Sequence, residues 1–298
     1  LKTALVDLDY QEVVTYSFID PKKSDLISMI SESEKVSLKN PISNEMSVMR
    51  SSLLPGLIEA YKYNANRHQE RIRLFECGLV FKQERDSIRQ ESRVAGLISG
   101  DRMPRSWIND KGDADFYDLK GDVEILVGLS RSENEYSFIK SSHESMHPGQ
   151  CAQAILPDET IVGHIGALNP RILQGLGLED SIFVFELKLK ALQLGMIPKA
   201  ETLSKFPSVA RDLAILVGSE IPAAQILGSV TDNAGEYLVN SRIFDVYQGD
   251  GVEKGKKSIA LGLTWQHPSR TLSDEEINTI IYRCVKGLEQ QFNANLRN

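Results

Sequence analysis

The stretch Ser258-Ile-Ala-Leu-Gly-Leu-Thr-Trp-Gln266 alternates large apolar side chains with small ones. Successive side chains of a strand point to opposite faces, so the large members share one face and the small members share the other. The large members are Ile259, Leu261, Leu263 and Trp265, and the small ones are Ala260, Gly262 and Thr264. The pattern predicts a strand that turns its large side chains toward a core.

The segments around this strand predict a compact domain of strands and helices. A capping box, Ser273-Asp-Glu-Glu276, opens a helix with apolar residues at helical spacing as far as Phe292. Residues 211–217 and 238–247 are predicted strands, and the helix between them opens at a Ser219 cap with Pro222 near its first turn. A short last strand is expected around residues 296–297. The order β-α-β-β-α-β predicts a ferredoxin-like (split βαβ) domain.

The region before residue 200 mixes strands and helices without a regular βαβ alternation, which favours an antiparallel α+β domain. The predicted strands are residues 12–19, 36–39, 72–81, 151–156, 161–168 and 182–189, and the predicted helices are residues 22–31, 53–67 and 115–129. Residues 195–204 contain Gly and Pro and lack a clear period, which is typical of a linker. We therefore divide the chain into domains 1–202 and 203–298.

The composition is that of an ordinary globular protein. The 298 residues are 41% hydrophobic and 25% charged, and 41 acidic against 34 basic residues give a net charge of −7. This balance argues against a chain that coats nucleic acid non-specifically and allows only a focused basic patch. Three scattered cysteines indicate a reduced, cytoplasmic protein. We find no secretory signal and no membrane-spanning run, and we interpret the start at Leu1 as that of an excised fragment.

The motif His143-Glu-Ser-Met-His147 matches the HExxH pattern of zinc hydrolases. Zinc binding by this pattern requires both histidines on one face of a helix. Pro148 follows directly and disfavours the helical conformation at His147, so we do not expect a metal site. A metallohydrolase built on His143 and His147 is kept as a competing hypothesis. No P-loop, GxGxxG or GxSxG pattern is present, and no catalytic residue is predicted.

The binding candidates lie in the second region. Tyr247 ends a predicted strand just before a glycine-rich connection, where an exposed ring can stack on an unpaired base or can instead cap the core. A small basic cluster lies on the same connection and extends to three arginines if the sheet brings them together: Lys254, Lys256, Lys257, Arg211, Arg242 and Arg270.

Ordered motifs along almost the whole chain resemble one family, the β subunits of bacterial phenylalanine–tRNA ligase. Those of the second region resemble its ferredoxin-fold anticodon-binding domain: Phe206-Pro-Ser-Val-Ala-Arg-Asp-Leu-Ala214, Phe244-Asp-Val-Tyr247, Lys257-Ser-Ile-Ala260, Thr271-Leu-Ser-Asp-Glu-Glu276 and Ala294-Asn-Leu-Arg297. Those of the first region are similar to its catalytic-like module: Asn40-Pro-Ile-Ser43, Met49-Arg-Ser-Ser-Leu-Leu-Pro-Gly56, Leu74-Phe-Glu-Cys-Gly78, His147-Pro-Gly149 and Gly163-His-Ile-Gly166. The chain resembles the carboxy-terminal part of this subunit.

The resemblance implies an α2β2 enzyme that charges tRNA(Phe) with phenylalanine, using ATP and Mg2+. It places the chemistry in the α subunit, so the implied partners are that subunit and tRNA(Phe), with no DNA, no membrane and no cofactor or metal in this fragment. It also implies a class II synthetase-like antiparallel sheet domain before the ferredoxin-like one, with residues 52–67 packing against the α subunit. The family's amino-terminal domains, for editing and for a structural magnesium site, are missing from the chain, so neither property is expected.

One sequence position indicates that the first region has lost the catalytic activity of class II synthetases. By the resemblance, class II strands carry an arginine two residues before a glutamate, where the guanidinium holds the ATP phosphate. With Glu76 in the glutamate position, the arginine position holds Leu74, and Arg73 points to the opposite face of the strand. The fragment alone is therefore expected to be inactive.

For the anticodon site, the resemblance carries over to Ala214, Tyr247 and Ser258. The matching family positions meet the anticodon bases by packing, stacking and hydrogen bonding. Arg211 is expected as a phosphate or structural partner in the same site. The alternative function is that of a non-catalytic interaction protein with the same fold and no tRNA role.

Overall fold

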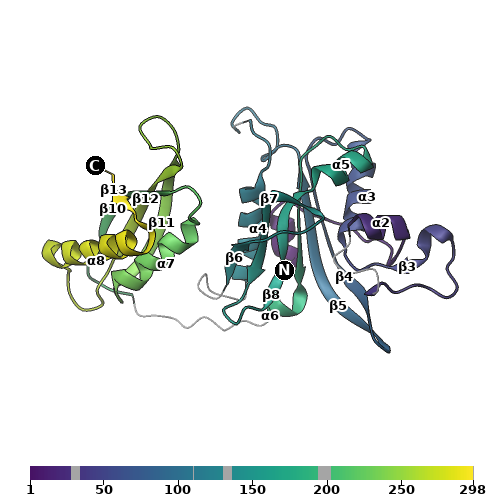
Figure 1. The fold of residues 1–298 in the computed structure, drawn as a ribbon, viewed down its shortest axis with the longest axis horizontal. Helices are drawn as coiled ribbons and strands as arrows, with labels where there is room; N and C mark the ends of the chain where they lie inside the picture. The colour runs from purple at the N-terminus through teal and green to yellow at the C-terminus, as the bar shows by residue number, and fades with distance from the viewer. Residues whose placement is uncertain (28–33, 110, 130–135, 194–202, 298) are drawn as a thin grey trace. The chain divides into compact units, whose positions relative to one another are not determined.

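The computed structural model describes residues 1–27, 34–109, 111–129, 136–193 and 203–297. The chain divides into two compact units, Leu1–Pro198 and Lys199–Asn298, which run from purple to teal and from green to yellow in Figure 1. The predicted linker at residues 195–204, with the predicted domain boundary after residue 202, lies almost wholly outside the described residues. None of the described helices is long and apolar enough to span a bilayer.

A seven-stranded sheet forms the centre of the first unit. Neighbouring strands are antiparallel except for the parallel pair β1 and β4. In sheet order the strands are β1 (Gln11–Glu12), β4 (Ile72–Glu84), β5 (Ser87–Ser99), β9 (Ile182–Lys188), β8 (Ile161–Leu168), β7 (Met146–Ile155) and β6 (Ser137–Lys140). A separate two-stranded sheet pairs β2 (Phe18–Ile19) with β3 (Val48–Met49).

Helices cover both faces of the seven-stranded sheet, so its strands turn apolar side chains toward two cores. One core lies under α3 (Leu54–Ala65) and is joined by α2 (Pro21–Leu26) and α5 (Pro170–Leu176). The other core lies under α1 (Lys2–Asp7), α4 (Phe116–Gly128) and α6 (Leu189–Gln193). Burial of apolar surface on both faces supplies the main stabilising free energy of the unit.

Glu76 on β4 is one of two buried carboxylates that hold the segment before α3 against the sheet. It accepts hydrogen bonds from Arg50 Nη1 at 2.7 Å and from the Thr15 hydroxyl at 2.7 Å. Arg50 Nε also donates to the Leu79 carbonyl at 2.9 Å. The side chains of Arg50 and Glu76 are 5% and 4% exposed. A Cβ at Gly78 would lie 2.3 Å from Arg50 Nη2, so the glycine leaves the space that the guanidinium fills.

Glu186 on β9 is the second buried carboxylate. It accepts hydrogen bonds from the Ser52 hydroxyl at 2.7 Å and from the Leu53 backbone N–H at 2.9 Å. The Ser52 hydroxyl in turn accepts the Leu54 N–H at 3.1 Å. These bonds satisfy donors that the first turn of a helix leaves unpaired, and Arg93, 3.6 Å away, supplies a countercharge. The start of α3 is thereby fixed to β9 as well as to β4.

The second unit is a four-stranded antiparallel sheet with two helices on one face (Figure 1). In chain order its elements are β10 (Val209–Gly218), α7 (Ala223–Ala234), β11 (Leu238–Tyr247), β12 (Lys256–Trp265), α8 (Asp274–Phe292) and β13 (Asn295–Leu296). The sheet order β11-β12-β10-β13 is that of a split βαβ, as predicted. The core between sheet and helices contains the four predicted large residues of β12.

Three sequence-based predictions of local structure are wrong. Residues 12–19 are not one strand but contain the end of β1 and the whole of β2, because Thr15 between them bonds to the side chain of Glu76 on β4 and not to the backbone of a strand. Residues 36–39 form only an isolated bridge, between Ser37 and Val48. The N-cap residue of α7 is Pro222, so Ser219 does not cap this helix.

We expect Arg50→Ala to lower the free energy of unfolding by about 3–5 kcal/mol, because it leaves the Glu76 carboxylate buried without its cation. Denaturant titration of the variant and the unsubstituted chain measures the difference. Arg89→Ala is the matched control, since it breaks an ion pair with Glu84 whose side chains are 58% and 44% exposed, and it should cost about 0–1 kcal/mol. Equal losses in the two variants would contradict a structural role of the Arg50–Glu76 pair.

Candidate nucleic-acid interface

The face of the second sheet that α7 and α8 leave uncovered is the candidate binding surface, and we call it the open face. Residues directly opposite one another in antiparallel strands share a face. The strand register assigns three rows to the open face: Leu216, Ser258 and Tyr247; Ala214, Ala260 and Asp245; Asp212, Gly262 and Arg242. On β12 this face carries Ser258, Ala260 and Gly262, which with Ala214 of β10 form a floor of small side chains on which a planar ring can approach the backbone closely.

Tyr247 stands at the end of β11 on the open face, directly opposite Ser258. Its side chain is 38% exposed, whereas Ser258 is 5% exposed. The Tyr247 hydroxyl donates a hydrogen bond to the Asp250 carbonyl at 3.1 Å. The ring is thus a partly exposed surface that is held at its hydroxyl end, and it does not cap the core, which lies on the other side of the sheet.

Arg297 reaches the open face from the opposite edge of the sheet. Its backbone N–H donates to the Ala214 carbonyl at 2.9 Å, just beyond the pairing of β13 with β10. Its guanidinium carbon lies 5.5 Å from the centroid of the Tyr247 ring. No role for Arg297 follows from the sequence, although it ends the motif Ala294-Asn-Leu-Arg297, because its proximity to Tyr247 arises only from the pairing of β13.

Arg211 lies apart from the other predicted site residues. It is opposite Leu263 in the ladder, which places its side chain on the helix side of the sheet. There its Nη2 forms an ion pair with Asp274 Oδ1 at 2.5 Å, in the first turn of α8. The structure therefore brings Ala214, Tyr247 and Ser258 together and separates Arg211 from them.

Most of the charged side chains in the predicted basic cluster form hydrogen bonds or ion pairs with neighbouring groups of the second unit. Lys257 Nζ donates to two backbone carbonyls ahead of α7, and burial lowers the pKa of this amine. Lys256 pairs with Glu253 at 2.8 Å. Arg270 bonds to Glu276 at 2.6 Å and, together with the bond from the helix cap, lowers the pKa of that carboxyl to about 2. These charges are satisfied within the unit, so they do not form one continuous patch.

The histidines of the HExxH motif are not arranged to bind zinc. His143 lies before β7 and His147 lies within it, so no helix brings their rings to one face. His143 Nδ1 accepts a hydrogen bond from the backbone N–H of Ser145, and His147 Nδ1 accepts one from the backbone N–H of Gly149. Within the described ranges, no group of three or more His, Cys, Asp and Glu side chains is placed to hold a metal ion. The metallohydrolase hypothesis therefore has no ligand set.

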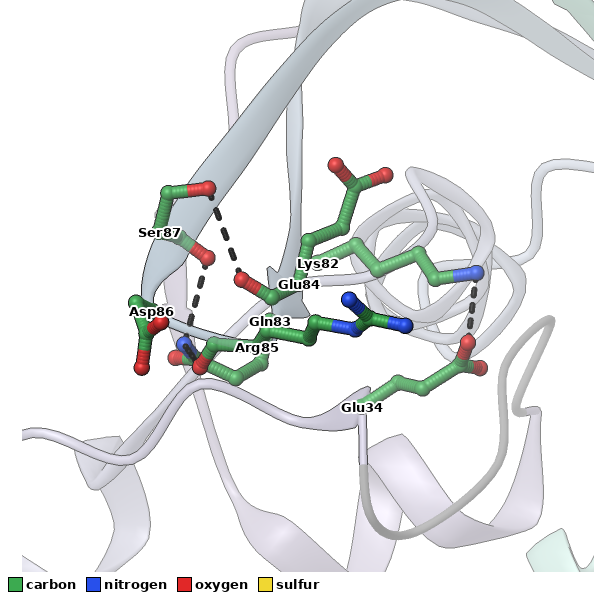
Figure 2. A pocket seen from close by; sticks show the side chains of 7 residues that line it. All are labelled: Glu34, Lys82, Gln83, Glu84, Arg85, Asp86 and Ser87. Atoms are coloured by element: carbon green, nitrogen blue, oxygen red, sulfur yellow. Dashed lines mark hydrogen bonds and ion pairs between the residues drawn. The ribbon is translucent and has the colours of Figure 1, made fainter.

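A charged hollow of about 730 Å³ lies at the tip of the β4–β5 hairpin in the first unit (Figure 2). Lys82 Nζ lies 2.5 Å from a Glu34 carboxylate oxygen, and the Gln83 amide donates to the backbone carbonyls of Arg85 and Ser87. Every lining residue is polar or charged, whereas small-molecule sites are mostly apolar. We therefore assign no ligand to this hollow.

Comparison with known proteins finds a matching family model for each of the two units. A family model described as the phenylalanyl tRNA synthetase beta chain CLM domain matches residues 1–189, and one described as a ferredoxin-fold anticodon binding domain matches residues 204–297. The chain is 46% identical over 297 residues to the phenylalanine–tRNA ligase beta subunit of Pseudomonas putida, and 42% identical over 298 residues to that of Coxiella burnetii. Each alignment covers 100% of this chain and 37% of the relative.

Among solved structures, a pyrrolysyl tRNA synthetase of Desulfitobacterium hafniense is similar with a TM-score of 0.48 and 16% identity, over 65% of this chain and 63% of that one.

The two matched domains, in this order, are those of a tRNA synthetase chain. The chain belongs to the family of phenylalanyl-tRNA synthetase β chains. It spans 37% of the length of the curated relatives that it matches. The ferredoxin-like fold predicted for the second region is confirmed by the sheet order and by the anticodon-binding domain match.

We expect His164 on β8 to make the first unit less stable in acid. Burial, together with the nearby His143, Arg93 and Lys188, lowers the pKa of His164 to about 4, whereas the unfolded value is about 6.5. Protonation therefore favours the unfolded chain, so this contribution to stability is complete above about pH 6.5 and is lost as the pH falls toward about 4.

Denaturant titrations at a series of pH values test this, and His164→Gln should flatten the curve of stability against pH between these limits. The exposed His68, replaced by Asn, should leave the curve unchanged. A slope that persists in the His164→Gln chain would assign the acid sensitivity to other groups.

Proposed function

We propose that the chain takes part in charging tRNA with phenylalanine as part of a phenylalanine–tRNA ligase, and that its second unit binds the anticodon of tRNA(Phe). Its family and the anticodon-binding domain match over residues 204–297 support this function. The observation that carries it is the open face, where the partly exposed ring of Tyr247 shares the sheet surface with Ser258, Ala260 and Ala214 and has the Arg297 guanidinium carbon 5.5 Å from its centroid.

Each residue of this site has a role that follows from its chemistry and place. The partly exposed ring of Tyr247 stacks on an unpaired base, because every base offers a π face. Ser258 and Ala214 lie on the floor beside it, where a hydroxyl supplies a hydrogen bond and a methyl group permits close packing. Arg297 adds a positive charge near the RNA backbone. Arg211 stabilises the start of α8 from the other side of the sheet and does not touch RNA.

The first unit acts without chemistry of its own and is class II synthetase-like in architecture. Leu74 occupies the position expected for a phosphate-binding arginine, and it is 4% exposed in the core under α3. Arg50 already fills the space beside Glu76. Arg73 lies on the opposite face, as predicted, and pairs with Asp122 at 3.0 Å. ATP and Mg2+ are therefore bound by the α subunit.

The α subunit is the proposed protein partner, in an α2β2 assembly. The matched relatives are named beta subunits, which supports a complementary chain. Residues 52–67 supply the contact, since α3 buries one side against the sheet and keeps Tyr63 on its outer side 58% exposed.

A second candidate is an interaction protein of the same fold with no tRNA role. Arg211, Arg270 and Lys256 form ion pairs with neighbouring carboxylates. These ion pairs favour the interaction protein, because they neutralise positive charge that would otherwise bind phosphates. Binding of a tRNA with an altered anticodon to the assembled enzyme discriminates the two. Unchanged affinity favours the interaction protein, and weaker binding favours an anticodon reader.

We expect Tyr247→Ala to weaken tRNA(Phe) binding by about 1–3 kcal/mol, because it removes the stacking surface. A titration of labelled tRNA followed by fluorescence anisotropy, at one fixed salt concentration, measures the affinity. Tyr282→Ala is the matched control, since this tyrosine is 63% exposed but lies on α8. Unchanged affinity of the Tyr247→Ala chain would remove this residue from the site.

We also expect this chain to show no phenylalanine-dependent ATP–pyrophosphate exchange alone and to co-elute with separately purified α subunit. Size-exclusion chromatography with the exchange assay across the peak tests both statements. Exchange by the chain alone would overturn the assignment of chemistry to α. If the two elute separately, a run with a full-length β subunit shows whether the missing contact lies outside these 298 residues or whether the contact assigned to residues 52–67 is wrong.

A further inference from the structure

The connection from β11 to β12 contains three glycines that serve different purposes. Gly251 and Gly255 have φ values of 85° and 82°, a left-handed conformation that favours glycine. Gly249 is not among the described residues with positive φ, so its backbone conformation admits an alanine. The Val252 N–H donates to the Gly249 carbonyl at 3.0 Å and closes the turn at this point. Any constraint on the residue at position 249 therefore comes from the space around it and not from its backbone conformation.

The space over Gly249 is filled by the ring of Tyr247. A Cβ at position 249 would lie 2.8 Å from the Tyr247 hydroxyl oxygen and 3.0 Å from ring atom Cζ. Non-bonded carbon atoms prefer separations of about 3.5–4.0 Å, so an alanine side chain and the ring cannot both hold these positions. The tyrosine hydroxyl passes over position 249 because it donates to the carbonyl of the next residue, Asp250.

The geometry of tyrosine decides how such a conflict is relieved. Its hydroxyl oxygen and Cζ lie on the axis of the Cβ–Cγ bond, so rotation about that bond moves neither atom. Only rotation about Cα–Cβ, or a backbone shift, takes the hydroxyl away, and either one carries the whole ring with it. An alanine at position 249 therefore displaces the ring of Tyr247 from this position.

We propose that Gly249 is a positioning residue for Tyr247, and that its missing side chain sets the plane on which an unpaired base stacks; this inference rests on the proposed function of the open face. The loop draws the hydroxyl over Gly249 and so holds the ring on the open face, where Tyr247 lies opposite Ser258. Stacking depends on this orientation, and a ring that is already oriented binds without a further entropic cost.

The test is Gly249→Ala in the full 298-residue chain, with labelled tRNA(Phe) as the probe. We expect binding to weaken by about threefold to thirtyfold, a part of the stacking contribution. The thermal unfolding midpoint should stay the same, because the substituted backbone is not strained. Gly228→Ala on α7 is the matched control, since nothing lies within 4 Å of the added Cβ, and it should leave binding unchanged.

The same substitution in a Tyr247→Ala background separates positioning from other effects. If Gly249 acts through the ring, Gly249→Ala should then change the affinity by less than about twofold, because the two sites share one interaction. An equal loss in both backgrounds would overturn the inference, as would unchanged affinity of the single Gly249→Ala variant while Tyr247→Ala weakens binding. If Tyr247→Ala itself has no effect, Tyr247 is not part of the site and the inference falls with it, whereas the altered-anticodon test decides the proposed function separately.

Discussion

The architecture of the first unit depends on the burial of two carboxylates, Glu76 and Glu186, beneath one short segment of chain. A buried carboxylate costs several kcal/mol unless a cation and hydrogen-bond donors satisfy it. Arg50 supplies the cation for one, and Ser52 with the backbone of Leu53 supplies donors for the other. Because the same residues lead into α3, the requirement to satisfy two charges also fixes the helix on the sheet. The guanidinium, the helix start and the buried Leu74 together fill this face of β4.

In the second unit, the contrast in size between the two faces of β12 leaves one face of the sheet uncovered, and this is the face proposed to bind RNA. The large side chains draw α7 and α8 onto one face, and the small ones leave the other flat. The groups that flank this floor come from the two edges of the sheet, Tyr247 from β11 and Arg297 from the residue after β13. These two side chains reach toward each other across the floor, and the Arg297 guanidinium carbon lies 5.5 Å from the centroid of the Tyr247 ring.

The features that the sequence predicted are those that depend on residues close together in the chain. The capping box at Ser273 and the alternation along β12 are confirmed, and so are α3, α4 and the element order of the second unit. The features it did not predict depend on distant partners. Thr15 leaves the predicted strand to meet Glu76, and β5 has no counterpart among the predicted strands because its first half is polar and exposed. In the site, the grouping of Ala214, Tyr247 and Ser258 came from family motifs, whereas the place of Arg211 depends on strand register.

The order of strands in the second sheet also constrains how the unit is made. β10 lies inside the sheet and is the first of its strands to be synthesised, but both of its neighbours, β12 and β13, come later in the chain. Until they emerge from the ribosome, β10 carries unpaired N–H and C=O groups along both edges, which are a template for pairing with other chains. The helix α7 follows immediately and can cover one face early, but it protects neither edge. The nascent unit is therefore most exposed to misassembly before β12 emerges, and one edge of β10 stays open until β13 follows.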